Sequence, residues 1–427
     1  MEMKAPRGTY DILPVEAQKW QYIESIMRQT AACFGYQEIR TPIFEHTELF
    51  QRGVGETTDI VSKEMFVFQD KAKRSLALRP EGTASCVRSL IENGVSKGVM
   101  PVKWYYSGPM FRYANVQKGR FRQFHQFGVE VFGSANPQVD AEVIILMLRI
   151  LQRLGLNQPE LHVNSVGCPE CRQVYREKLV DFIAPHAEQL CRDCQKRYWQ
   201  NPLRVLDCKE DSCHKTIAGF PPIIDSLCRE CRDHYQKVQQ LLSASGVAYQ
   251  HDDKLVRGLD YYTRTAFEVL LPGIGAQSAI GGGGRYDGLV RECGGPDTPG
   301  IGFALGMERI LLALEQERAL PDTKPPCDIF IVAMNQNFTE QAFQMLSELR
   351  CAGFAADKDY NDRSSKAQMK HANRIGAPWV LLLGDEEINT ESVTLRNMHN
   401  SQQVRIARKD LLSELNSLVT KVGGKIV

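Results

Sequence analysis

The sequence of 427 residues lacks the marks of several classes of protein. No apolar run approaches the roughly 18–20 residues that a membrane-spanning helix needs, so we expect no membrane partner. Residues 1–14 contain no apolar segment of the signal-peptide type, and a cytoplasmic location is therefore the expectation. Charge of one sign is not in excess, because 52 lysines and arginines stand against 51 aspartates and glutamates. A nucleic-acid partner would therefore have to bind local basic patches.

Glycine-rich stretches are present, but they lack the spacing of two common nucleotide-binding motifs. Residues 281–284 are consecutive glycines, and no Gly-Lys-Ser/Thr follows them as in a P-loop. Gly300, Gly302 and Gly306 depart from GxGxxG, and the acid about twenty residues further on, Asp322, lies in a proline-rich stretch and not at a strand end. A dehydrogenase is therefore a remote interpretation. The four glycines either let the backbone approach a ligand or form a flexible loop.

The composition is that of a globular protein, with 43% hydrophobic and 24% charged residues. The length allows for about two or three domains with substantial cores. Cysteines number 13, and eight of them lie between residues 168 and 231. In a reducing compartment, such clustering favours metal binding or free thiols over disulfides.

The most informative stretch is residues 107–132, which reads as two strands joined by a basic loop. Side chains alternate between the two faces of a strand. One face of the second strand therefore collects Arg122, Phe124, Gln126, Gly128 and Glu130. A hairpin edge that faces water is one interpretation. However, a glycine weakens a strand unless something must come close, and we predict that a small ligand lies on this face.

Two further segments near the N-terminus have clear patterns. Apolar residues recur at helical spacing from Ala17 to Ala31, after Pro14 and before Gly35. A strand with Pro42 follows, and this proline is tolerated only at an edge or special position. At Leu78-Arg79-Pro80-Glu81-Gly82-Thr83, the proline ends a strand, and a helix is expected to start at Glu81.

The cysteines from 168 to 231 form four close pairs. Two pairs with two intervening residues can together hold one tetrahedral zinc ion. The best-fitting set by spacing is Cys191, Cys194, Cys228 and Cys231. Two interpretations stay open: a structural zinc site, or thiols without a metal in an insertion that its own helices stabilise.

After the proline-rich residues 319–327, the remaining stretch reads as a compact α/β domain. Expected strands cover residues 328–333, 378–383, 393–396 and 403–406. Arg363, Lys366, Lys370 and Arg374 are spaced by three, four and four residues, which predicts one basic helix face. This face is either simply solvated or binds phosphates.

Several of these segments resemble one known family. Phe111-Arg112, the basic loop and QKGRFRQFHQFGVE resemble motif 2 of the class II aminoacyl-tRNA synthetases, in the version of the histidyl-tRNA synthetases. The helix and strand near the N-terminus resemble motif 1, and residues 300–316, with Arg309, resemble motif 3. The string LVRGLDYYTRTAFEV at residues 255–269 resembles a segment peculiar to histidyl-tRNA synthetases.

The resemblance covers nearly the whole chain, with its motifs in the family's order, and it implies a domain organisation. An α+β catalytic core, with the antiparallel sheet of class II synthetases flanked by helices, is expected at residues 1–166 and 247–318. A cysteine-rich insertion occupies 167–246, a linker 319–327, and an α/β anticodon-binding domain 328–427.

The implied activity is histidine–tRNA ligation: ATP and magnesium activate histidine to histidyl-adenylate, and histidine is transferred to tRNA(His). A homodimer is expected by resemblance. The alternative is an inactive, synthetase-like regulatory subunit of ATP phosphoribosyltransferase, the first enzyme of histidine biosynthesis. Such regulators typically lose the Arg-Gly-Leu-Asp-Tyr-Tyr string and the C-terminal domain, and this chain has both.

The resemblance also assigns roles to matching positions. The ATP-binding set is Arg112, Arg120, Arg257 and Arg309, and the arginines at the α-phosphate, Arg112 and Arg257, are the catalytic ones. The histidine-binding set is Glu81, Thr83, Gln126, Glu130, Tyr261, Tyr262 and Tyr286. The tRNA-binding set is Gln117, Lys118, Arg363, Lys366, Lys370 and Arg374. One position departs from the pattern, because Ala114 stands where motif 2 usually has a glutamate that contacts adenine.

Overall fold

The computed structural model describes residues 3–55, 58, 60–199, 201–206, 208, 210–256, 259–272 and 279–418. The chain forms two compact units, residues 1–321 and 322–427, with the boundary at Pro321. Each unit has its own hydrophobic core. None of the helices in the described ranges has an apolar stretch long enough for a bilayer crossing.

An eight-stranded sheet organises the first unit, in the order β1-β5-β6-β11-β10-β9-β7-β8. Only β1–β5 and β7–β8 pair in parallel, so the sheet is mainly antiparallel, as the sequence predicted. Its strands are β1 (Gln37–Glu38), β5 (Val102–Phe111), β6 (Gln123–Phe132), β7 (Glu160–Ser165), β8 (Gln250–His251), β9 (Thr263–Leu270), β10 (Ala279–Arg285) and β11 (Gly300–Gly306).

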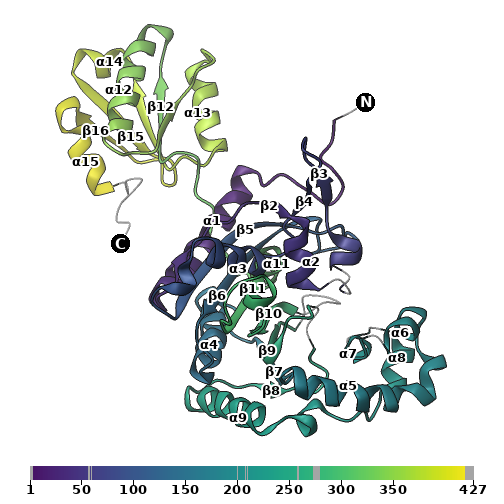
Figure 1. Ribbon diagram of the computed structural model, residues 1–427. Coiled ribbons are helices and arrows are strands. Elements are labelled where there is room, and N and C mark those ends of the chain that lie inside the picture. The colour runs from purple at the N-terminus through teal and green to yellow at the C-terminus, as the bar shows by residue number, and fades with distance from the viewer. Residues whose placement is uncertain are drawn as a thin grey trace. The chain divides into compact units, whose positions relative to one another are not determined.

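Four helices contribute to the core on one face of this sheet, namely α1 (Pro14–Cys33), α4 (Pro137–Arg153), α9 (Arg229–Ala244) and α11 (Met307–Gln316) (Figure 1). Phe127, Val129 and Val131 of β6 are buried in this core. Because strand side chains alternate, Gln126, Gly128 and Glu130 face the other side of the sheet. Strand β6 therefore packs into the core with one face and presents the candidate ligand face with the other.

A small three-stranded sheet lies near the N-terminus, in the order β2-β4-β3. The single strand expected around Pro42 is divided, because β1 joins the large sheet while β2 joins this small one. Pro42 lies in the connection, where its missing N–H breaks no strand pairing. The elements here are β2 (Phe44–His46), α2 (Thr47–Val54), η1 (Ile60–Glu64), β3 (Val67–Gln69), β4 (Ser75–Leu78), α3 (Thr83–Glu92) and η2 (Val95–Lys97).

The cysteine-rich insertion consists of short helices between β7 and α9 (Figure 1). They are α5 (Pro169–Ile183), η3 (Ala184–Gln189), α6 (Arg192–Arg197), α7 (Leu203–Leu206), α8 (Asp211–Thr216) and η4 (Ile223–Ser226). Tyr175, Leu179 and Val205 are fully buried within it. The short α10 (Leu289–Glu292) follows β10 in the catalytic part.

The second unit is a five-stranded sheet in the order β13-β12-β14-β15-β16 with helices around it (Figure 1). The four expected strands are present, and β13 and α14 were missed because they are only three and five residues long. The elements are β12 (Ile329–Ala333), η5 (Gln336–Phe338), α12 (Thr339–Cys351), β13 (Ala356–Lys358), α13 (Ser365–Arg374), β14 (Trp379–Leu383), α14 (Asp385–Asn389), β15 (Ser392–Asn397), β16 (Gln403–Ala407), η6 (Arg408–Asp410) and α15 (Leu411–Leu418).

Candidate active site

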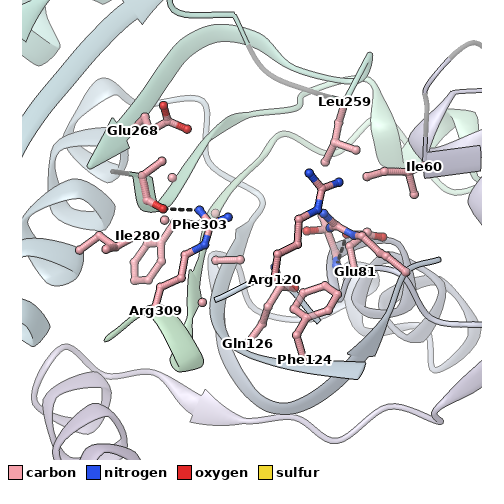
Figure 2. Close-up of a pocket in the computed structure, with 18 of the residues that line it drawn as sticks. Ile60, Glu81, Arg120, Phe124, Gln126, Leu259, Glu268, Ile280, Phe303 and Arg309 are labelled. Carbon is pink, nitrogen blue, oxygen red and sulfur yellow. Dashed lines mark hydrogen bonds between the residues drawn. The ribbon is translucent and has the colours of Figure 1, made fainter. Parts of the chain in front are cut away.

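A cavity of about 580 Å³ opens on the face of the large sheet opposite α1 and α4. Its walls come from β6, β9, β10 and β11, the start of α3 and the start of α11. Nine of the residues that the sequence assigned to histidine or ATP line it, namely Glu81, Thr83, Arg112, Arg120, Gln126, Tyr261, Tyr262, Tyr286 and Arg309. Residues that are far apart in the sequence therefore share one site (Figure 2).

The Glu130 carboxylate lies at one end of this site and is almost completely buried. It accepts hydrogen bonds from Thr83 Oγ1 at 2.7 Å and from the Tyr106 hydroxyl at 3.4 Å, and a third from the Tyr286 hydroxyl. Burial raises the pKa of Glu130 from 4.5 to about 8, because the ionised form is poorly solvated there. The site therefore holds a carboxyl group that changes its charge near neutral pH.

Glu130 is not itself one of the cavity-lining residues, but its neighbours Thr83, Tyr286 and Gly302 are. A Cβ atom at Gly302 would overlap the Glu130 carboxylate and the backbone oxygen of Val129. Because Gly302 has no side chain, the Glu130 carboxylate can lie directly against the cavity wall.

Glu81 precedes α3, which starts at Thr83 and not at Glu81 as expected. Its carboxylate accepts hydrogen bonds from the backbone N–H groups of Thr83 at 2.7 Å and Ala84 at 2.9 Å. Two backbone N–H groups at the start of the helix are thereby satisfied. Burial raises the pKa of Glu81, although these hydrogen bonds oppose the shift. The residue thus fixes the helix start and also lines the cavity.

Three buried tyrosines form the adjoining wall. The ring centroids of Tyr261 and Tyr262 are 4.7 Å apart, and those of Tyr261 and Tyr286 are 5.6 Å apart. Burial raises the pKa of Tyr261 and Tyr286 well above the ordinary value. Both hydroxyls therefore stay protonated and can donate hydrogen bonds at neutral pH.

Arginines surround the rest of the cavity. Arg112 donates through Nε to the backbone oxygen of Pro80 at 2.8 Å, and its guanidinium lies 5.2 Å from the centre of the Phe124 ring. Arg120 pairs with Glu64 at 2.8 Å. Figure 2 shows Arg120 and Arg309 pointing into the cavity from two different sides, and Arg309 donates to the backbone oxygen of Ala279. Such an arrangement suits a polyanionic ligand.

Gly128 is explained by a protein side chain and not by a ligand. It pairs directly with Tyr106 across β5 and β6. A Cβ atom at Gly128 or at Gly82 would overlap the Tyr106 ring, so this ring lies between two glycines. Phe124 and Gln126 on this face of the strand line the cavity, but the close approach inferred at Gly128 is made by Tyr106.

The glycines at 281–284 belong to strand β10, so the flexible-loop interpretation was wrong. Gly281 and Gly282 line the cavity. A Cβ atom at Gly283 would overlap the backbone oxygen of Gly302 in the neighbouring strand. The glycines therefore permit close strand packing as well as access to the cavity.

The motif 2 loop lies at the cavity rim. Ala114 is buried and lines the cavity, whereas Gln117 and Lys118 are exposed. Gln117 and Arg120 form a backbone turn in which Gly119 has a φ of +73°, a conformation that favours glycine. Arg257 lies outside the described residues, so its expected place at the α-phosphate stays a prediction.

The basic helix face in the second unit has three members, not four. Lys366, Lys370 and Arg374 are exposed on α13 at intervals of four residues. Arg363 precedes the helix and pairs with Asp359, so its inclusion in the helix was wrong. The intervening Ser364 stands at the N-cap position with a non-helical backbone, so the helix does not extend back to Arg363.

The cysteines group differently from the expected set. Cys191 and Cys194 lie near Cys208 and Cys213, whereas Cys228 and Cys231 lie near Cys168 and Cys171. Spacing alone suggested Cys191, Cys194, Cys228 and Cys231. In the fold, however, the chain passes close to Cys168 again just before α9 begins, so Cys228 lies near Cys168. Two four-cysteine groups therefore replace the single predicted one.

The sequence analysis missed several residues of the site. Tyr106, Glu268 and Phe303 all line the cavity without an assigned role. Glu308, beside Arg309, accepts hydrogen bonds from the backbone N–H of His125 at 2.9 and 3.0 Å, which ties α11 to β6. The pairing of an aromatic residue with a glycine across two strands could have indicated Tyr106.

Comparisons with known proteins agree with this geometry. The family described as histidyl-tRNA synthetase matches residues 8–171 and 223–310, and that described as anticodon binding domain matches 328–418. Residues 172–222, which hold the second cysteine group, lie outside both matches.

Relatives match along the whole length. The chain is 60% identical to a histidine–tRNA ligase of Syntrophomonas wolfei, over 98% of this chain and 99% of that protein. It is 54% identical to one of Desulforamulus reducens, over 95% and 97%. The crystal structure of apo histidyl-tRNA synthetase from S. aureus is similar, with 42% identity, a TM-score of 0.83, and coverage of 97% of this chain and 99% of that one. These matches do not favour the regulatory-subunit alternative, and the chain belongs to the histidyl-tRNA synthetase family.

Proposed function

We propose that the chain, a histidine–tRNA ligase by its family, activates histidine with ATP in the cavity of the first unit and then transfers it to tRNA. One observation carries this proposal. A buried carboxyl group with tyrosine hydroxyls lies at one end of a cavity whose other walls present arginines. The first end suits a polar side chain of limited size, and the second suits a triphosphate.

We assign histidine to the end with the carboxyl groups. Glu81 and Thr83 would hold the α-amino group, together with Gln126. The Gln126 Oε1 atom is buried and has no hydrogen-bond partner among the described residues, which supports a substrate donor at this position. Glu130 and Tyr262 would bind the two imidazole nitrogens, and Tyr261 and Tyr286 would close the pocket.

This pocket would select its substrate by hydrogen bonds. An amino acid that lacks the imidazole N–H groups would leave buried polar groups without partners, which is strongly unfavourable. A site of this kind can discriminate between side chains by large factors without a separate editing site.

We assign ATP to the arginine-lined end. Arg112 and Arg257 would contact the α-phosphate, and Arg120 and Arg309 the β- and γ-phosphates. An oxygen of the histidine carboxylate attacks the α-phosphorus, the bond to the β-phosphate oxygen breaks, and pyrophosphate leaves. Negative charge develops on the phosphoryl oxygens in this step, and positioned guanidinium groups stabilise it. The carboxylate is already ionised, so no general base is needed, and positioning dominates.

Magnesium would accompany the phosphates. Hard cations prefer carboxylate and phosphate oxygens, and Glu268 offers a carboxylate on the cavity wall beside Arg309. We propose that Glu268 and the phosphate oxygens would hold the ion, which would neutralise charge on the leaving pyrophosphate.

A pair of variants tests the two ends separately. Thr83→Val should raise the KM for histidine and leave the KM for ATP nearly unchanged, whereas Arg309→Gln should do the reverse. Loss of one hydrogen bond to a charged partner corresponds to about 1.5–3 kcal/mol, or about 10- to 150-fold. If both variants changed the same KM, the assignment of the two ends would be wrong.

The second unit would bind the anticodon region of tRNA(His). The exposed cations of α13, Lys366, Lys370 and Arg374, support this role together with Arg363, because phosphates are bound by such clusters. Gln117 and Lys118 would contact the acceptor arm. We further propose a homodimer, as the family resemblance implies, and a structural role for Zn²⁺ in the insertion.

The assignment of α13 can be tested by charge reversal. Lys366→Glu with Lys370→Glu should raise the KM for tRNA in aminoacylation and leave ATP–pyrophosphate exchange unchanged. Lys409→Glu, at an exposed lysine outside α13, is the matched control. Equal effects of both variants on the KM for tRNA would indicate a general charge effect and would contradict a specific site on α13.

A further inference from the structure

We propose that the insertion holds two structural zinc ions in two separate four-cysteine sites. The sulfur atoms of each site lie within 4.8 Å of one another. Site A is Cys168, Cys171, Cys228 and Cys231, and site B is Cys191, Cys194, Cys208 and Cys213. This inference does not depend on the assignment of histidine and ATP to the cavity.

The sulfur positions suit tetrahedral zinc. A Zn–S distance of about 2.3 Å places the sulfurs of a tetrahedral site about 3.8 Å apart. The Sγ atoms of Cys191 and Cys208 are 3.8 Å apart, and those of Cys168 and Cys171 are 3.4 Å apart. Small side-chain rotations would bring each set to ideal geometry. On binding, each site would form four Zn–S bonds, and the four thiols would release their protons to the solvent.

The local structure explains why the thiols converge. Cys168, Cys191 and Cys228 are the cap residues at the starts of α5, α6 and α9. In each case the partner cysteine is the third residue of the helix, so both sulfurs lie at the same helix end. The N-terminal end of a helix favours thiolate over thiol.

Backbone N–H groups also point at the sulfurs. The N–H of Cys228 donates to Cys171 Sγ at 3.0 Å, and the N–H of Cys191 donates to Cys213 Sγ at 3.2 Å. Each of these bonds joins one half of a site to the other half. Gly167 has a φ of +67°, and a Cβ atom there would collide with Cys171, so a glycine is needed directly before site A.

Three of the helices in the insertion are very short. α6, α7 and α8 have six, four and six residues, which is far below the length at which an isolated helix is stable. Site B spans α6 and α7 and reaches into α8, where Cys213 lies. Site A joins the start of α5 to the start of α9, 57 residues apart at Cys171 and Cys228. Metal bonds at these places would add folding free energy to that of the apolar core of the insertion.

Disulfides explain the arrangement less well. All 13 cysteines are free. A disulfide joins only two sulfur atoms, whereas four sulfur atoms converge in each of the two groups. The second cysteine of each pair is buried, namely Cys171, Cys194, Cys213 and Cys231. Burial of thiols around a common centre is the pattern of a closed structural metal site.

The two sites also lie next to segments that contact Asp260, directly before Tyr261 of the cavity. Arg172, adjacent to Cys171, donates to the backbone oxygen of Asp260 at 3.1 Å. Asn201, between the two halves of site B, donates to the Asp260 carboxylate at 3.2 Å. Zinc would therefore also steady this wall of the cavity, a consequence that does rest on the proposed function.

The test is the zinc content of the purified full-length chain, measured by inductively coupled plasma mass spectrometry. We expect two zinc ions per chain. Cys228→Ser in site A and Cys208→Ser in site B should each halve this content, and the double variant should abolish it. Cys351→Ser, at an exposed cysteine outside both sites, is the matched control and should retain both ions.

A second measurement covers variants that do not fold. The wild-type chain, reduced and stripped of metal, is titrated with Co²⁺, and thiolate-to-cobalt absorption should saturate at two equivalents. Saturation at one equivalent, or a zinc content that Cys208→Ser and Cys228→Ser do not change, would overturn the two-site proposal. No binding by the reduced chain, or disulfide-bonded peptides from the native chain, would overturn it altogether.

Discussion

The substitution Glu130→Gln directly tests whether burial raises the pKa of the Glu130 carboxyl group. In the folded chain the pKa of Glu130 is raised to about 8, and in the unfolded chain it returns to its ordinary value near 4.5. Between these two values the folded state holds a proton that the unfolded state has lost. Stability from this group is therefore fully present below the unfolded pKa and is lost as the pH rises towards 8.

The magnitude follows from the two pKa values. Between about pH 5 and about pH 8, the shift corresponds to a loss of about 3–4 kcal/mol in the free energy of unfolding. Glutamine resembles the protonated carboxyl group and does not titrate. The variant should therefore match the wild type within about 1 kcal/mol at the lower pH and be clearly more stable than the wild type at the higher pH.

Urea unfolding at several pH values measures this difference. The relevant quantity is the stability of Glu130→Gln relative to the wild type, because other titrating groups cancel in it. A difference that did not change between about pH 5 and about pH 8 would refute the reasoning. It would mean that the three hydroxyl donors keep Glu130 ionised in the folded state despite burial.

Under the proposed assignment of histidine to this pocket, Glu130 would also link histidine binding to proton release. Imidazole N–H donors stabilise the ionised form of Glu130, so binding should expel its proton and become tighter as the pH rises towards 8. Calorimetry in buffers with different ionisation enthalpies should detect this proton in the wild type and not in Glu130→Gln. The variant should also bind histidine about 10- to 150-fold more weakly, because it loses a charged hydrogen-bond acceptor.

Three further changes have defined outcomes. Gly128→Ala should destabilise the chain by about 1–3 kcal/mol, because the new methyl group meets Tyr106, and the cost in urea unfolding should shrink in a Tyr106→Ala background; equal costs in both backgrounds would contradict this. Ala114→Glu should lower the KM for ATP, because Ala114 lines the cavity where the family has an adenine contact; an unchanged or raised KM would count against it. Asp140→Asn should cost about 1.5–3 kcal/mol in urea unfolding, because the fully buried Arg285 loses the buried one of its two carboxylate partners and keeps only Asp287; a cost below about 1 kcal/mol would show that the pair with Asp140 is not needed.

Much of the fold was predictable because local patterns determine it. The apolar spacing of α1 and the alternation in β6 both follow from periodicity. Nine of the residues that line the cavity were predictable because the motifs of the family mark them. Periodicity alone would not have brought Glu81, Gln126 and Tyr286 into one cavity.

The remaining features depend on contacts between distant segments. The role of Gly128 depends on the register that places Tyr106 opposite it, and no pattern within β6 reveals that register. The grouping of the cysteines depends on where β7 ends and α9 begins, because Cys168 and Cys228 are brought together by the return of the chain. Spacing identified the cysteines that cluster, but tertiary structure determines which pairs combine.

The most direct test of the central claim is ATP–pyrophosphate exchange by the wild-type chain with magnesium and each amino acid separately. The account predicts exchange with histidine alone. No exchange with any amino acid while histidine still binds would contradict activation at this site, and exchange with another amino acid would contradict the assignment of the carboxyl-containing pocket to histidine.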